Sequence, residues 1–364
     1  MSVTVVIPCL NEEGSIKECV RLAKEAFADE RDLEIIVADN GSRDRSRELA
    51  TSGGALVVDE RRQGYGSAIM RGLREAKGDY ILITDADNTY DHRDGALLIE
   101  ELKKGAEFAI GDRIHGKVDK GAMPWLHQHL GTPVLTWVLN KFFGSRVHDI
   151  NCGLRAVRRE RLKDLRLRSP GMEFASEMVI HAQKAGLKFA EVPIHYYCRH
   201  HGQAKLRTFR DGWRHLRFIL LCAPLPVFFF PALIGFVTSA LLYASPRFGF
   251  QVMGELLSIV SFQVLIFGIL AKVYLWVVDS FLVDQRFGKW IQMFQLEYGI
   301  FISLVLLLAG LLFFQALDLA DLIRGSALIA IGVQIFFSSF LLSTIMFKRD
   351  SGRGLDWKGP DAGV

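Results

Sequence analysis

The chain has 364 residues, and half of them are hydrophobic, which excludes one small domain and an ordinary soluble protein. Its formal net charge of +4 is too mild to indicate a nucleic-acid-binding protein. Charged residues are frequent up to Arg217 and sparse afterwards. We therefore predict a soluble N-terminal domain followed by a membrane domain.

The N-terminal part alternates short apolar runs with helical patterns. Strands are predicted at 3–7, 33–38, 80–84 and 107–110, and helices at about 15–28, from about 44, and at 95–104. This rhythm predicts an α/β fold with a mainly parallel, Rossmann-like sheet covered by helices. In such sheets, ligands bind outside the carboxyl ends of the strands.

Acidic loops follow three of the predicted strands: PCLNEE at 8–13, ADNGSRD at 38–44 and TDADNTYD at 84–91. One such loop is often only a helix cap, but three at one sheet edge predict a shared crevice. Asp85 and Asp87 flank Ala86, and alternate residues of an extended segment point the same way. Such a pair suits Mg²⁺ or Mn²⁺, which stabilises a leaving diphosphate. A surface turn with two acids is the alternative.

Two other features are not interpreted as cofactor sites. The stretch GYGSAIMRG at 64–72 lacks the dinucleotide-binding spacing, so we predict a loop that enters a packed helix. The five cysteines form no CxxC pair, and no His/Cys spacing indicates zinc. They are interpreted as reduced cytosolic thiols.

Four long windows without charge predict four transmembrane helices, at 218–246, at 256–271 with its apolar pattern continuing to 278, at 298–317 and at 325–347. The preceding segment, 206–222, predicts an amphipathic helix in the membrane interface, with Phe209, Trp213, Leu216 and Leu220 along one stripe. The predicted domains are 1–205 (catalytic), 206–222 (amphipathic juxtamembrane helix), 223–347 (four-helix transmembrane domain) and 348–364 (tail).

Basic residues predict the orientation in the membrane. They gather in the loop between the second and third helices and in the tail, whereas the other two loops hold one arginine each, Arg247 and Arg324. The positive-inside rule then places the N-terminal domain and the tail in the cytosol of a multi-pass cell-membrane protein. Lys272, near the cytosolic end of the second helix, is expected to extend to the interface or to meet a lipid phosphate.

The motifs PCLNEE, ADNGSRD and DAD, together with DINCGLRAV at 149–157, resemble the family 2 glycosyltransferases with the GT-A fold. Within that family the chain is most similar to dolichyl-phosphate and polyprenyl-phosphate sugar synthases, of the dolichyl-phosphate mannosyltransferase type. The resemblance covers about residues 3–222. It implies a metal-dependent enzyme that moves one hexose from a nucleotide sugar onto a polyprenyl or dolichyl phosphate with inversion. Thr89 stands where the mannosyl branch often has Gln, so UDP-glucose and GDP-mannose donors both stay open.

The resemblance also implies roles for individual residues. It assigns nucleotide-sugar binding to Pro8, Leu10, Glu12, Asp39, Asp85, Ala86, Asp87, Arg113, Arg199 and Lys205. Among these, Asp85 and Asp87 would hold the metal, and Asp87, Arg113 and Arg199 would be catalytic. Asp149, Arg155 and Glu173 would lie near the sugar and the acceptor.

The segment 115–147 is expected to cradle the acceptor with Trp125, His127, His129 and Trp137, and ordinary helix packing is the alternative. A lipid phosphate is largely dianionic at pH 7, because its second pKa is about 6, so the reaction needs no dedicated general base.

Two other functions stay open. A processive membrane polysaccharide synthase shares this fold, although the chain lacks the Q-x-x-R-W stretch typical of that class. A non-catalytic membrane scaffold or lipid-translocating unit with a decayed transferase domain is the second. Assembly into a homo-oligomer is also left open.

Overall fold

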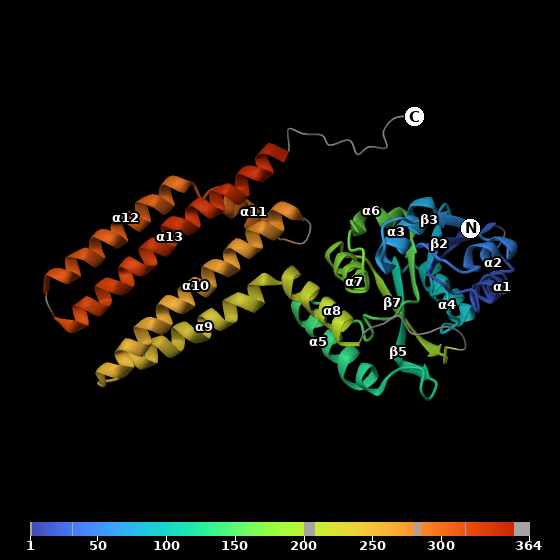
Figure 1. Cartoon of the computed structure of the whole chain (residues 1–364), viewed down its shortest axis with the longest axis horizontal. Helices are drawn as coiled ribbons and strands as arrows, with labels where there is room; N and C mark the ends of the chain where they lie inside the picture. The colour runs from blue at the N-terminus through green and yellow to red at the C-terminus, as the bar shows by residue number, and fades with distance from the viewer. Residues whose placement is uncertain are drawn as a thin grey trace. The chain divides into compact units, whose positions relative to one another are not determined.

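The computed structural model describes residues 2–30, 32–199, 208–279, 283, 285–316 and 318–352. Contacts divide the chain into two compact units, Met1–Ile219 and Leu220–Val364 (Figure 1). The first unit holds the α/β sheet, and the second consists of helices.

The first unit is built on a seven-stranded sheet with the order β3-β2-β1-β4-β6-β5-β7. The strands are β1 (Ser2–Cys9), β2 (Asp32–Asp39), β3 (Leu56–Asp59), β4 (Tyr80–Ile83), β5 (Phe108–Val118), β6 (Arg155–Arg158) and β7 (Phe189–Tyr196). Only β6 is antiparallel to its neighbours, β4 and β5. All other paired strands are parallel, which confirms the mainly parallel sheet.

Helices connect the strands and cover the sheet (Figure 1). They are α1 (Ile16–Ala26), α2 (Ser46–Ser52), α3 (Tyr65–Glu75), α4 (His92–Lys103), the π-helical turn η1 (His127–Gly131), α5 (Thr132–Phe143), the 3₁₀ turn η2 (Arg159–Arg161), α6 (Leu162–Leu165), α7 (Phe174–Lys184) and α8 (Thr208–Cys222). Helix α4 begins three residues before the predicted start because the Asp91 side chain accepts a hydrogen bond from the Arg93 backbone N–H and caps it.

The core lies at the central strands. Val3, Val5 and Val6 of β1 and Ile81 and Leu82 of β4 are fully buried. Because helices cover both faces of a parallel sheet, such strands are continuous apolar runs, which is why their positions were readable from the sequence. The short strand β6 carries an arginine at each end and has no such signal.

Helix α8 lies within the predicted interfacial segment, 206–222, and it contacts α7 within the first unit. The imidazole of His215 is buried and lies 2.9 Å from the Ser176 hydroxyl. Arg214 forms an ion pair with Glu173 at 3.3 Å. Trp213 on the predicted apolar stripe is 59% exposed, and the placement of this helix in the membrane interface stays a prediction.

The second unit contains four helices that are long and apolar enough to cross a membrane. Its helices are α9 (Pro224–Tyr243), α10 (Phe248–Val278), α11 (Gln285–Gln292), α12 (Leu296–Phe313), the 3₁₀ turn η3 (Phe314–Ala316) and α13 (Leu319–Gly352). Helix α13 therefore extends beyond the predicted span, to residue 352, and Arg353 and Lys358 of the predicted tail lie outside the described residues.

Small residues allow the long helices to approach closely, as is usual in membranes. A Cβ atom added to Gly310 of α12 or to Gly325 of α13 would lie 2.7 Å from the carbonyl oxygen of the other glycine. The ammonium of Lys272 lies 4.1 Å from the centre of the Phe287 ring of α11. This aromatic contact was not among the two expected environments of Lys272.

Candidate active site

The loop after β1 is attached to the loop after β2 by hydrogen bonds in both directions. The backbone N–H groups of Asn11 and Glu12 donate to the hydroxyls of Ser42 (2.9 Å) and Ser46 (2.7 Å). The Arg43 N–H donates to the side chain of Asn11 at 2.7 Å. These contacts join two of the predicted acidic loops and hold the buried carboxylate of Glu12 between them.

Pro8, Leu10 and Asp39 also lie at these strand ends. Pro8 belongs to β1 and pairs with Ala38 of β2, and Leu10 begins the following loop. Asp39 is 1% exposed, and its carboxylate accepts the N–H groups of Gly41 and Ser42, both at 3.2 Å. The structure thus uses Asp39 to shape its own loop, and its expected contact with a nucleotide stays a prediction.

Asp85 and Asp87 follow β4, and each carboxylate is positioned by a neighbour. The Tyr65 hydroxyl donates to Asp85 Oδ1 at 2.9 Å. The backbone N–H and the hydroxyl of Thr89 donate to Asp87 Oδ1, at 3.1 and 2.6 Å. Between the two acids, the carbonyl of Ala86 accepts the Ser15 hydroxyl at 2.7 Å, which fixes the turn.

The negative charges of the two carboxylates oppose each other. Burial, followed by the negative charge of Asp87, raises the pKa of Asp85 to about 7. A divalent cation would relieve this repulsion, and a pair of carboxylate oxygens is the donor set that Mg²⁺ or Mn²⁺ takes. The residues present therefore fit the expected metal.

Arg199, just after β7, carries the positive charge of this region. Its guanidinium donates to Asp87 Oδ2 and, at 3.1 Å, to Glu12 Oε1. One cation is thus shared by acids from the ends of β1 and β4, as a bound cation would be. The predicted partner Lys205 lies outside the described residues.

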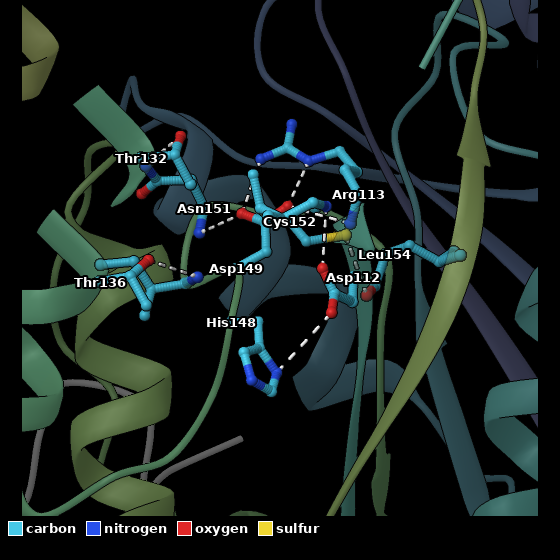
Figure 2. A network of polar contacts seen from close by, with 12 residues as sticks. Asp112, Arg113, Thr132, Thr136, His148, Asp149, Asn151, Cys152 and Leu154 are labelled. Atoms are coloured by element: carbon cyan, nitrogen blue, oxygen red, sulfur yellow. Dashed lines mark hydrogen bonds and ion pairs between the residues drawn. The ribbon is translucent and has the colours of Figure 1, made fainter. Parts of the chain in front are cut away.

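Arg113 and Asp149 form a buried ion pair with each other (Figure 2). Arg113 Nε and Nη2 donate to the two carboxylate oxygens of Asp149 at 2.6 and 2.9 Å, and the side chains are 8% and 0% exposed. The guanidinium carbon of Arg113 also lies 5.1 Å from the centre of the Tyr196 ring. The resemblance assigned the two residues to different ligands, whereas the structure brings them together.

Arg155 and Glu173 are used for contacts within the first unit. The Arg155 guanidinium is buried and donates to the carbonyls of Cys152, Ala175 and Ile150 at 2.8, 2.6 and 2.6 Å. It therefore stabilises the loop that carries Asp149. Glu173 forms the ion pair with Arg214 of α8. Neither contact tests the expected proximity to sugar and acceptor.

The expected acceptor segment presents large apolar side chains to its surroundings. Trp125 and Trp137 are 70% and 64% exposed, and Leu130 and Val134 are also exposed. Ordinary helix packing therefore does not account for the two tryptophans. Exposed tryptophans of this kind are typical of surfaces at the membrane interface.

Sequence reasoning missed Tyr65 as a partner of Asp85. Its segment was interpreted as a loop entering a helix, and α3 confirms that, but the first helical residue also reaches the acidic pair. The signal in the sequence was the glycine that precedes Tyr65. In the structure Gly64 has a positive φ of 138°. A Cβ at this position would lie 2.1 Å from the carbonyl oxygen of Pro170, so only glycine allows this approach.

Comparisons with known proteins agree with this arrangement. The family described as "Glycosyl transferase family 2" matches residues 4–166. A low-salt glycan biosynthesis hexosyltransferase of Haloferax volcanii is 37% identical over 94% of this chain and 89% of its own. A dolichyl-phosphate hexose transferase of the same organism is 33% identical over 57% of this chain and 88% of its own.

Among solved structures, a mycobacterial protein is similar in fold. The likeness covers 60% of this chain and 74% of that protein, with a TM-score of 0.50 and 22% sequence identity. This similarity concerns the fold alone.

Proposed function

This chain belongs to glycosyl transferase family 2, and we propose that it moves one hexose from a nucleotide sugar onto a polyprenyl or dolichyl phosphate. The observation that carries the proposal is Arg199, which is shared between Glu12 and Asp87 at the ends of β1 and β4. These acids and this arginine have the charges needed to bind a metal–diphosphate group.

Donor binding uses the acidic loops. Asp85 and Asp87 would hold Mg²⁺ or Mn²⁺, which stabilises the charge of a leaving nucleoside diphosphate. Arg199 exchanges its carboxylate partners for phosphate oxygens of the donor, because charge-assisted contacts between guanidinium and phosphate are strong. Glu12 and Tyr65 keep the acidic loops in position while this exchange takes place.

Sugar transfer requires alignment more than proton transfer. The acceptor phosphate is largely dianionic at neutral pH, its second pKa being about 6, and its oxygen attacks the anomeric carbon directly. The bond from that carbon to the diphosphate oxygen breaks, and its electron pair leaves with the diphosphate, so the anomeric centre inverts. The buried Arg113–Asp149 ion pair is a rigid support for this alignment.

The acceptor is a lipid, and the membrane unit is consistent with that. We propose that the four apolar helices span the cell membrane with the catalytic unit on the cytosolic side. Arg286 and Lys289 of α11, between the second and third spans, support this orientation. Trp125, Trp137 and Trp213 are exposed on the catalytic unit and suit the headgroup region.

The test is sugar transfer by purified full-length protein, with a panel of radiolabelled nucleotide sugars and polyprenyl phosphate. We expect Asp87→Ala to lower metal-dependent transfer by about 10²–10³-fold, the cost of removing one group that stabilises developing charge, with an unchanged melting temperature. Asp79→Ala is the control, because Asp79 is exposed at the opposite end of β4.

Each other outcome has a meaning. Unchanged transfer by Asp87→Ala would remove the metal assignment. A polymer in place of one sugar per lipid would favour a processive synthase, and nucleotide binding without any transfer would favour a non-catalytic membrane protein.

A further inference from the structure

A second group of metal-ligating side chains lies beside the buried Arg113–Asp149 pair. Asp112 and His115 come from β5, and His148 comes from the loop before β6. One ligand atom from each of the three lies within 4.8 Å of the others. The group uses none of the residues of the acidic loops, and sequence reasoning missed it because His148 lies 33 positions from His115.

One carboxylate oxygen is the centre of this group. Asp112 Oδ2 lies 2.6 Å from His115 Nδ1 and 3.7 Å from His148 Nδ1. Figure 2 shows His148 directed at Asp112, with the second of these contacts dashed. The two imidazole rings are 4.5 Å apart, and Glu191 Oε2 of β7 lies 2.8 Å from His148 Nδ1. Nitrogen and oxygen donors from three segments therefore converge.

The carboxylates are fixed, whereas the imidazoles have room to turn. Asp112 is 4% exposed, and its other oxygen accepts the backbone N–H groups of Ile114 and His115 at 2.8 and 3.1 Å. Glu191 Oε1 likewise accepts the His148 N–H at 2.6 Å. The side chains of His115 and His148 are 57% and 55% exposed. A cation entering from solvent could therefore replace the histidine–carboxylate hydrogen bonds.

The donor set selects the kind of cation. Two imidazoles and one carboxylate are ligands typical of Zn²⁺, whereas Mg²⁺ takes oxygen ligands. We propose that Asp112, His115 and His148 form a site for a zinc-type transition-metal ion, in which Glu191 positions the His148 backbone by accepting its N–H. Three protein ligands leave one position of a tetrahedral site for water.

The position of this site gives it a role beyond binding. Asp112 directly precedes Arg113, and His148 directly precedes Asp149. An ion held by Asp112 and His148 therefore fixes, at the surface, the two backbone segments that carry the buried pair. The site formed by Asp112, His115 and His148 thus positions the buried Arg113–Asp149 pair. Its ion does not contact the reacting atoms.

The experiment measures zinc binding to the full-length protein in detergent micelles, by competition with a chromophoric chelator and by the visible spectrum of bound Co²⁺. We expect His148→Gln and Asp112→Asn to lower zinc affinity by at least about tenfold, because even outer contacts to a metal ligand are worth 10–100-fold. Glu191→Gln should lower it less, since it acts through His148.

The matched control is His195→Gln. His195 Nε2 lies 2.8 Å from Asp119 Oδ1, so it forms the same kind of histidine–carboxylate pair, and among the residues that the structure describes no third ligand joins it. This variant should bind zinc as the unchanged protein does. Asp87→Ala should also retain the zinc site while losing the response to Mg²⁺ or Mn²⁺, which separates this inference from the proposed function.

The zinc-induced rise in melting temperature gives a second measurement, compared with each variant's own metal-free value. His115→Gln, at a more exposed position, repeats the test should His148→Gln fail to fold. Equal zinc affinity in the unchanged protein and in these histidine variants would overturn the proposal, as would an equal loss in His195→Gln.

Discussion

Arg113 and Arg199 both bind aspartates at the sheet edge, but in opposite ways. Arg113 is buried and makes two parallel hydrogen bonds to Asp149 alone. Arg199 is 23% exposed and divides its guanidinium between Glu12 and Asp87, which belong to different loops. The first pair is almost fully shielded from solvent, whereas the second joins two loops through a partly exposed guanidinium.

The two arginines therefore differ in how easily each can exchange its carboxylate partner. A buried ion pair with good geometry is costly to break, because removing one partner leaves the other charge without water. A partly exposed arginine can be resolvated at little cost and can move to another anion. The family resemblance assigned nucleotide-sugar binding and catalysis to both arginines alike.

The largest effect is expected from breaking the buried Arg113–Asp149 pair. Asp149→Ala leaves the Arg113 guanidinium buried without its acid, which should lower the free energy of unfolding by about 3–5 kcal/mol. Chemical denaturation of the purified protein measures this. Asp164→Ala removes an acid from the more exposed pair with Arg161, and should cost about 1 kcal/mol or less. Similar small losses of unfolding free energy in both variants would mean that the buried Arg113–Asp149 pair does not stabilise the fold.

The second largest effect is expected from acid pH, which should lower the free energy of unfolding. The two arginines should therefore be compared at a pH where the protein is stable. Burial lowers the pKa of His92 and of His215 to about 4, from an ordinary value of about 6.5. The unfolded chain therefore binds more protons between these values. The stability from keeping both imidazoles neutral is fully present above pH 6.5 and is lost as the pH falls towards 4.

From pH 7 to pH 5 the loss should be about 2 kcal/mol for each histidine. Thermal unfolding at several pH values measures it, and His215→Gln should remove its own contribution of about 2 kcal/mol from the pH dependence. A profile identical to that of the unchanged protein would show that His215 is not buried in its neutral form.

Opening the shared site should change kinetics more than stability. Arg199→Ala should raise the donor KM about tenfold, equivalent to about 1.4 kcal/mol, and should change unfolding by about 1 kcal/mol or less. Steady-state kinetics with the best donor of the panel measure the first quantity. Arg199→Lys keeps the positive charge but loses the bridging geometry. Its donor KM should therefore lie between those of the unchanged enzyme and Arg199→Ala. Donor kinetics like those of the unchanged enzyme would argue against a donor role for Arg199.

The smallest effect is expected at Tyr65. Tyr65→Phe removes one hydrogen bond to Asp85, worth about 1 kcal/mol, and should raise the metal concentration for half-maximal activity about threefold to tenfold. Tyr197→Phe is the control, because the Tyr197 ring stacks on His195. An unchanged metal requirement in both variants would show that Tyr65 does not position Asp85.

Several parts of the molecule could be predicted from local sequence patterns. The apolar runs of β1, β2 and β4, the acidic loops after them and the four long apolar helices are each encoded by neighbouring residues. Strand β6 could not be predicted in the same way. Its four residues enter the sheet only because they pair with β4 and β5, so its position depends on distant segments.

Local sequence patterns were enough to predict where acids and arginines gather, because the carboxyl ends of parallel strands meet at one sheet edge. Which of these side chains bind one another depends on the folded chain. Asp149 lies 36 positions from Arg113, and Glu12 lies 187 positions from Arg199. Partner choice depends on how closely loops approach and how much water they exclude, and no local pattern encodes either quantity.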